Sequence, residues 1–268
     1  MLKLLVVCVN YNSYESLLDY LESLDKSLAN INDIYINVVV ADNSSEKQNF
    51  NFTFSNFNYQ IVQLPNLGYF GGAFEIINSM NAKDFDYTII SNVDVKYDIK
   101  SITKLVNLPK ENNIAWIAPQ IFSSLKNKDN NPQRLYRCSK IKLQLLLLMY
   151  KLPFLCKLYQ KTLYKRHRQS ESTKSGTQIY CGHGSVIILT SNFFDNYSNV
   201  KYPIFLYGEE IFLAELIMQK SLKVIYYPEI IFYDEEHVST KKLGKKYFEY
   251  NYKAIKYILS EFYKWVSL

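Results

Sequence analysis

A short polar run follows an apparent buried strand near the middle of the chain. Residues 87–91 favour β-structure and lead directly into Asn92 and Asp94. Ligands of open α/β sheets gather beyond the carboxyl ends of the strands, so a carboxylate there is well placed to act. A hard divalent cation would take oxygen ligands from Asp94 and from a substrate phosphate. The alternative is that Asp94 caps a helix expected near residues 99–106.

Two further groups with chemical potential occur late in the chain. Glu209 and Glu210 precede a helical pattern, and His237 ends an acidic run. Adjacent residues at a helix start point about 100° apart, so only one glutamate can face a pocket well. A positioned carboxylate can take the proton of an attacking hydroxyl, which is general-base chemistry. The alternative is that both acids merely complement the helix dipole.

These residues need a scaffold, and the N-terminal part of the chain has the alternating pattern of an α/β sheet. Apolar strands are expected at residues 4–9, 35–41, 59–64, 87–91 and 114–118, with an amphipathic helix over residues 17–28. Strand, helix and parallel strand form a βαβ unit. Polar loops follow four of the strands, at residues 10–13, 42–45, 66–72 and 92–95. We expect these loops to converge on one pocket.

The C-terminal part returns to the same elements. Short strands are expected at residues 177–181, 186–189, 222–227 and 230–233, with helices over residues 211–219 and 245–265. The sequence therefore predicts an α/β fold with a mixed, mostly parallel sheet flanked by helices. The glycine-rich turn at residues 66–72 has neither the GxGxxG nor the GxxxxGK[ST] spacing, so dinucleotide and P-loop binding are not supported.

Charge is concentrated in one segment. The 268 residues carry a net charge of +6, and residues 130–170 hold ten Lys and Arg with no Asp or Glu. An apolar, leucine-rich run inside this segment is broken by Lys151 and Pro153, and falls short of the roughly 20 apolar residues that span a bilayer. We expect residues 140–168 to dock on an anionic membrane surface. The alternative is that the leucines pack on the rest of the domain.

Other partners and compartments are less well matched. A leucine-rich core suits a membrane better than a phosphate backbone, so no nucleic acid partner is expected. The four cysteines form no CxxC pair, and the first residues lead into a strand pattern rather than a signal peptide. We expect a reducing, cytoplasmic setting, on the inner face of the cytoplasmic membrane.

Taken in order, the polar motifs resemble those of family 2 glycosyltransferases with the GT-A (Rossmann-like) fold. The likeness is to the rhamnosyltransferase-like branch of bacterial surface-polysaccharide assembly, and it covers nearly the whole chain. The motifs that carry it are Val9-Asn-Tyr-Asn12, Asp42-Asn-Ser-Ser45, Asn66-Leu-Gly-Tyr-Phe-Gly-Gly72, Asn92-Val-Asp94, Gly182-His-Gly-Ser185, Phe205-Leu-Tyr-Gly-Glu-Glu210 and His237-Val-Ser239.

The resemblance implies roles for matching residues. Asp42 would bind the nucleotide base, Asp94 would be the metal-binding carboxylate, and His237 would be a second ligand to Mn²⁺ or Mg²⁺. Asn92 stands where the family's DxD motif has its first acid. The donor-binding set would be Val9, Tyr11, Asn12, Asp42, Asn66, Gly68, Gly72, Asn92 and Asp94.

The same resemblance implies the catalytic acids and the reaction. Glu210 aligns with the usual base and is one methylene longer than the common Asp, with Glu209 beside it. The implied activity is inverting transfer of a sugar from a nucleotide diphosphate-sugar to a hydroxyl of a glycan acceptor, which we expect to be lipid-linked. The alternatives are a sugar-nucleotide-binding protein without transfer activity and a GT-A-like nucleotidyltransferase. The latter usually needs a basic glycine-rich loop, which residues 10–13 do not provide.

The expected organisation is one domain over residues 1–268. Residues 1–120 would form the nucleotide-sugar-binding half, residues 121–176 a basic apolar helical insertion, and residues 177–268 the acceptor and catalytic half.

Overall fold

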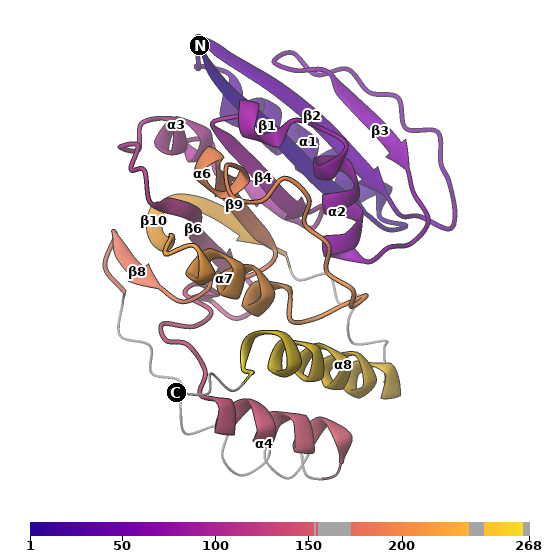
Figure 1. Ribbon diagram of the computed structural model, residues 1–268. Helices are drawn as coiled ribbons and strands as arrows, with labels where there is room; N and C mark the ends of the chain where they lie inside the picture. The colour runs from indigo at the N-terminus through magenta and orange to yellow at the C-terminus, as the bar shows by residue number, and fades with distance from the viewer. Residues whose placement is uncertain (153, 155–172, 236–243, 265–268) are drawn as a thin grey trace.

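The computed structural model describes residues 1–152, 154, 173–235 and 244–264 (Figure 1). The described part of the chain forms one 10-stranded sheet, in the order β3-β2-β1-β4-β9-β6-β10-β5, with β7 beside β6 and β8 beside β10. By paired length the sheet is mostly parallel, and helices flank it, as the sequence predicts.

The bounds of the strands follow the apolar runs of the sequence. The strands are β1 (Leu2–Asn10), β2 (Ile34–Asp42), β3 (Tyr59–Gln63), β4 (Tyr87–Asn92), β5 (Val95–Tyr97), β6 (Ile114–Ser123), β7 (Lys128–Asp129), β8 (Thr177–Ile179), β9 (Val186–Thr190) and β10 (Lys223–Asp234). The helices are α1 (Tyr14–Leu28), α2 (Tyr69–Asn78), η1 (Ala82–Asp84), α3 (Ser101–Val106), α4 (Lys140–Lys151), α6 (Ser191–Phe194), α7 (Glu209–Gln219) and α8 (Lys245–Phe262).

Strand β1 lies inside the sheet and is buried on both faces. Successive side chains of a strand point to opposite faces. Leu4, Val6 and Cys8 accordingly pack in a core cluster with the apolar face of α1. Val7 and Val9 pack in a second cluster, with residues of α2 and α7. The sheet is therefore the middle layer between two sets of helices.

The register of the parallel strands aligns their carboxyl ends. Asn10 at the end of β1 lies opposite Asp42 at the end of β2. On the other side of β1, Val9 lies opposite Asn92 at the end of β4. Three of the polar loops expected from the sequence thus leave the sheet side by side.

Strand β9 belongs to the C-terminal part of the chain but pairs inside the sheet. It runs antiparallel between β4 and β6, with Ile188 opposite both Ile89 and Ile117. The strands before residue 124 and those after residue 176 are therefore interleaved rather than stacked as separate sheets.

The prediction of two short strands over residues 222–227 and 230–233 is wrong, because β10 is continuous. Its register against β6 shifts between Tyr227 and Ile231, so an irregular step accommodates Pro228. Proline has no amide hydrogen for a ladder bond, and a bulge tolerates that loss.

Helices α4 and α8 are stacked below the sheet in Figure 1, with α8 between α4 and the rest of the molecule. Leu143 of α4 is fully buried, and the rings of Tyr150 and Tyr247 meet edge to face with centroids 6.2 Å apart. The basic apolar segment is thus helical over the part that the structure describes. No helix within the described ranges is both long enough and apolar enough to cross a bilayer.

Candidate functional site

Asp42 is the centre of a hydrogen-bond cluster at the end of β2. Its fully buried carboxylate accepts bonds from the Asn10 amide at 3.0 Å, the Tyr14 hydroxyl at 2.7 Å and the Gln63 amide at 2.7 Å. The Ser44 hydroxyl donates as well. Burial alone would raise the pKa of Asp42, but the bonds from Ser44, Tyr14 and Gln63 outweigh it and hold this pKa below its usual value. The carboxylate is therefore a fixed negative charge.

The loop after β1 is tied to the loop after β2. Asn12 has a left-handed backbone (φ 51°), and its amide nitrogen donates to the Ser44 hydroxyl at 2.8 Å. The Asn12 side chain donates to the Ser45 hydroxyl at 3.0 Å. Tyr11, between these anchors, is 50% exposed, whereas Val9 is buried. The Tyr11 ring is thus presented to solvent from a rigid loop.

The backbone of the glycine-rich loop at residues 66–72 contacts two other segments, one containing Asn43 and one containing Phe205. The Asn66 side chain accepts from the Gly68 amide at 3.2 Å, and the Asn43 side chain donates to the Gly68 carbonyl at 2.8 Å. A Cβ atom on Gly72 would lie 2.8 Å from the Asn43 amide nitrogen. On the other side, Gly68 touches the backbone of Phe205. Glycine is required here because neighbouring groups occupy the space of a side chain.

Glu209 and Glu210 begin α7 but lie in different surroundings. The segment before them turns through Gly208 at φ 82°, a conformation that favours glycine. Glu209 is 7% exposed and accepts from the Tyr207 amide at 2.9 Å. Burial, and then the charge of Glu210, raise the pKa of Glu209 to about 8.

Glu210 is half-buried and faces another loop. Its Oε1 accepts from the Gln133 side chain at 3.0 Å, and a Cβ atom on Gly184 would lie 2.8 Å from the same oxygen. Glu209 is therefore buried and bonded within its own segment, whereas Glu210 reaches the loop at residues 182–185.

That loop connects Glu210 to the end of β4. The His183 amide donates to the Asn131 side chain at 2.6 Å, and the Asn131 side chain donates to the Pro119 carbonyl at 2.7 Å. The His183 ring bonds the Ser185 hydroxyl at 2.9 Å. The Ser185 carbonyl accepts from the Asn92 amide at 3.1 Å. Asn92 and Glu210 thus both contact the loop at residues 182–185.

Tyr69 lies close to the carboxylates of the candidate site. Its hydroxyl is buried and has no hydrogen-bond partner among the residues that the structure describes. Burial, followed by the charges of Glu209, Glu210 and Asp94, raises the pKa of Tyr69. The acids from the two parts of the chain therefore act on one buried hydroxyl, and Asp94 belongs to the same neighbourhood as the pair on α7.

The metal prediction rests on residues that the structure covers only in part. His237 lies in residues 236–243, outside the described ranges. Within those ranges no group of three or more His, Cys, Asp or Glu side chains is arranged to hold a metal ion. Asp94 lies in the turn between β4 and β5, and its carbonyl accepts from the Glu235 amide at 3.2 Å.

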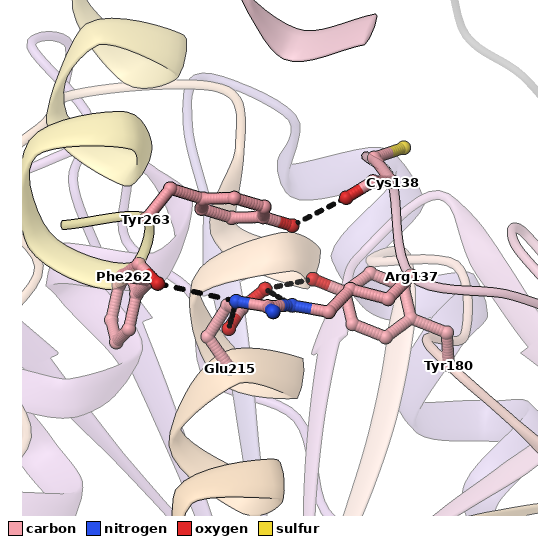
Figure 2. A network of polar contacts seen from close by, with 6 residues as sticks. All are labelled: Arg137, Cys138, Tyr180, Glu215, Phe262 and Tyr263. Atoms are coloured by element: carbon pink, nitrogen blue, oxygen red, sulfur yellow. Dashed lines mark hydrogen bonds and ion pairs between the residues drawn. The ribbon is translucent and has the colours of Figure 1, made fainter. Parts of the chain in front are cut away.

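An ion pair between the buried Glu215 and the partly exposed Arg137 holds α7 to the segment before α4 (Figure 2). Arg137 donates two bonds of 2.8 Å to Glu215, whose side chain is 1% exposed. The Tyr180 hydroxyl donates to Glu215 at 2.7 Å, and the guanidinium lies over the Tyr263 ring, 4.1 Å from its centroid. The network fixes the helix that carries Glu209 and Glu210.

Two surface hollows occur away from this edge. One lies at the amino ends of β1 and β2, beside Lys3, Tyr35 and Phe85. The other lies among Phe50, Phe54 and Tyr59. Neither is lined by the polar loops described above, so the candidate site lies at the loops and not in these hollows.

Several residues of the site were not predicted from the sequence. Tyr69 lies inside the glycine-rich motif, and Tyr14 begins the first helix, so their positions offered a signal. Gln63, Asn131 and Gln133 offered none, because their partners Asp42, His183 and Glu210 lie 21, 52 and 77 residues away.

No family model matches the sequence, and no curated protein sequence matches it. Solved structures do resemble it. Staphylococcus aureus TarS 1–349 in complex with UDP-GlcNAc has a TM-score of 0.56 and 12% identity, over 88% of this chain and 59% of that one. S. aureus TarS gives 0.55 and 11%, over 97% of this chain and 44% of that one.

A third neighbour comes from a second organism. The mannosyltransferase PcManGT of Pyrobaculum calidifontis, in complex with GDP-Man and Mn²⁺, gives 0.52 and 9%, over 88% of this chain and 58% of that one. In each case this chain spans less than two thirds of the neighbour. These neighbours are GT-A-type glycosyltransferases, and identities this low bear on the fold alone. The chain has the GT-A, Rossmann-like fold.

Proposed function

We propose that this protein is an inverting glycosyltransferase that moves a sugar from a nucleotide diphosphate-sugar to an acceptor hydroxyl. One observation carries the proposal. Asp42, Gly68, Asp94 and Glu210 come from separate parts of the sequence and lie at one edge of a GT-A sheet. Asn43 bonds Gly68, Gly68 abuts Phe205, and the loop at residues 182–185 contacts both Asn92 and Glu210. Ligands of such sheets bind at that edge.

The nucleoside end of the donor is assigned to the loops after β1 and β2. Asp42 supplies a fixed negative charge, and Tyr11 offers a half-exposed ring on which a base can stack. Val9, Asn12 and Asn66 are the neighbouring members of this surface. Because the buried Asp42 carboxylate already accepts bonds from Asn10, Tyr14, Ser44 and Gln63, a base N–H would have to replace one of these donors.

The diphosphate is assigned to the neighbourhood of Asp94. A single carboxylate fits Mg²⁺ or Mn²⁺ in the way these ions bind nucleotides, with one or two carboxylates and substrate oxygens in the shell. Asp94 and His237 would hold the ion, and Asn92, Gly68 and Gly72 would be the neighbouring members of the donor-binding set. When bound, the ion neutralises the charge of the leaving diphosphate.

Glu210 is assigned as the catalytic base. It takes the acceptor proton as the acceptor oxygen bonds to the anomeric carbon. The bond from that carbon to the diphosphate oxygen breaks, and the nucleoside diphosphate leaves with the electron pair. Attack from the face opposite the diphosphate inverts the configuration, through an oxocarbenium-like transition state.

The difference between the two glutamates supports this choice. The pKa of Glu209 is raised to about 8, so Glu209 holds its proton at neutral pH and is a poor base there. Glu210 is less buried and is oriented by Gln133. We therefore assign Glu209 to shaping the start of α7.

The acceptor is assigned by the resemblance of the motifs. We propose a glycan hydroxyl on a lipid-linked acceptor, in the rhamnosyltransferase-like branch of family 2, with the protein on the inner face of the cytoplasmic membrane.

The deciding experiment is a donor panel. The full chain is incubated with UDP-, dTDP- and GDP-sugars, with and without Mn²⁺, and release of nucleoside diphosphate is measured. We expect one class of donor to turn over. Glu210→Gln should lower kcat by about 10²-fold or more and leave donor binding intact, whereas Glu209→Gln should cost less.

Other outcomes have distinct meanings. Donor binding without turnover, with any acceptor offered, would indicate a sugar-nucleotide-binding protein. Release of inorganic pyrophosphate from a nucleoside triphosphate would indicate a nucleotidyltransferase. An active Glu210→Gln protein beside an inactive Glu209→Gln protein would move the base by one residue.

A further inference from the structure

Helix α4 has two apolar faces on opposite sides. Leu143 is fully buried, and Leu146, Leu147 and Tyr150 pack against the same core cluster. A second set of apolar residues is exposed instead: Ile141 at 70%, Leu145 at 57%, Leu148 at 48% and Leu152, just past the last turn, at 37%. One face of the helix therefore packs on the core, and the other remains exposed.

The exposed residues form a stripe. They follow the spacing i, i+4, i+7, i+11, so at about 100° per residue they fall within an arc of about 60°. The residues packed on the core are centred on the opposite side of the helix. In Figure 1, α8 lies between α4 and the sheet, so α4 is the helix farthest from the sheet among those that the structure describes.

Positive charge flanks the stripe on both sides. On the helical wheel, Lys142 lies to one side of it, and Lys140 and Lys151 lie to the other. Helix α4 contains no acidic residue, and residues 130–170 contain no Asp or Glu. Apolar surface bordered by lysines on a short helix is the pattern of a helix that lies in the plane of a membrane interface.

We propose that the exposed stripe of α4, formed by Ile141, Leu145, Leu148 and Leu152, docks the protein on an anionic lipid bilayer. The stripe enters the boundary between headgroups and acyl chains, while Lys140, Lys142 and Lys151 contact anionic headgroups. A bilayer is favoured over a protein partner because the charge around the stripe is of one sign. The opposite face of the helix packs on the core, as the alternative interpretation of the sequence expects for that side.

The docking face is linked to the candidate base by a short, braced segment. Gln133 contacts Glu210, and α4 begins seven residues later at Lys140, so the chain between them spans at most about 25 Å. Arg137, within this segment, is fixed to Glu215 of α7. The inference deepens the proposed function, on which it rests in one respect: a lipid-linked acceptor would reach Glu210 from the surface on which α4 lies.

Flotation with lipid vesicles tests the docking directly. The full chain, without nucleotide or acceptor, is mixed with vesicles of phosphatidylcholine containing phosphatidylglycerol, and with vesicles of phosphatidylcholine alone. We expect binding to the anionic vesicles that falls as salt is raised. The double variant Leu145→Gln/Leu148→Gln should reduce the bound fraction at least tenfold and keep the unfolding midpoint, because both side chains are exposed.

A matched control separates docking from general loss of apolar surface. Ile99→Gln/Leu125→Gln removes two side chains that are 61% and 68% exposed elsewhere on the protein, and should bind as the unmodified chain does. Absence of binding to anionic vesicles at low salt would overturn the inference, as would full binding by the α4 variant. A dimer in analytical ultracentrifugation that this variant dissolves would assign the stripe to a second copy instead. None of these outcomes depends on turnover, so failure here is distinguishable from failure of the proposed function.

Discussion

A Cβ atom built on Gly68 would lie 2.0 Å from the carbonyl oxygen of Phe205. The loop before α2 and the segment that leads to Glu209 and Glu210 are therefore in backbone contact, with no room for a side chain between them. This contact joins the proposed donor loop to the proposed catalytic acids.

Gly68→Ala should destabilise the protein strongly. The alanine would combine a left-handed backbone (φ 78°) with a clash against a carbonyl group, and we expect a loss of more than about 3 kcal/mol of unfolding free energy. Gly176→Ala is the matched control, because Gly176 has φ 76° but nothing within 4 Å of its Cβ position. The control should lose only about 1 kcal/mol. Urea unfolding measures both, and equal losses would mean that the Phe205 contact is unimportant.

Glu209 should make stability depend on pH. Its pKa rises from 4.5 to about 8 on folding, so between these values the folded state holds a proton that the unfolded state has lost. Its contribution is complete below pH 4.5 and is lost as pH rises towards 8, by up to about 1.4 kcal/mol per pH unit.

Glu209→Gln should remove most of this slope, because the neutral amide can still accept the bond from Tyr207. Urea unfolding at pH 5 and pH 8 tests the difference, which we expect to be about 2–4 kcal/mol smaller in the variant. Glu75→Gln, an exposed substitution on α2, should retain the slope of the unmodified protein. A Glu209→Gln profile parallel to that of the unmodified protein would contradict the raised pKa.

Asp94→Ala should abolish the enhancement of nucleotide binding by Mn²⁺. The variant removes the carboxylate that we assign to the ion and leaves the base-binding loops in place. Calorimetry of nucleoside diphosphate binding, with and without Mn²⁺, measures the effect. Asp84→Ala, at the opposite edge of the sheet, should behave as the unmodified protein. Unchanged metal dependence in the Asp94 variant would refute the assignment.

Arg137→Met should destabilise the protein by about 3–5 kcal/mol, because Glu215 would remain as a buried carboxylate bonded by Tyr180 without a cation. Replacing both charges, as Arg137→Met/Glu215→Leu, should recover most of this loss, since no unpaired charge is then buried. Urea unfolding measures the free energy of unfolding of the single and the double variant. Lys253→Met, which breaks an exposed pair with Glu249, should leave stability unchanged. A double variant as unstable as the single one would show that packing, rather than charge, is what Arg137 provides.

The strands of the sheet could be predicted because an apolar run of strand length is a local feature of the sequence. The apolar run at residues 4–9 becomes the buried centre of β1, and residues 35–41 become β2 extended by one residue at each end. Which strands are neighbours could not be predicted. The run at residues 186–189 indicates a strand, but nothing in it specifies an antiparallel position between β4 and β6.

The start of α2 illustrates a local limit. The sequence predicts a loop over residues 66–72, in which Gly71 and Gly72 are poor helix formers. The helix begins at Tyr69. Tertiary packing overrides propensity here, since Phe70 is buried and Gly72 lies against Asn43.

The acidic residues of the site could be located because each follows a recognisable strand or begins a helix. Their orientation could not. Glu209 and Glu210 are adjacent and chemically alike, but Glu209 is buried and bonded by the Tyr207 amide, whereas Glu210 is bonded by Gln133. Such differences arise from contacts between distant segments, which spacing along the chain does not encode.

The place of β9 in the sheet has a consequence for biosynthesis. On the ribosome, β1, β2 and β4 emerge first, and the inner edge of β4 has no strand to pair with until residues 186–190 have been made. An unpaired strand edge readily pairs with other chains. The nascent protein must therefore keep this edge from aggregation through the synthesis of α4 and the basic segment, and its folding is completed by a late strand rather than domain by domain.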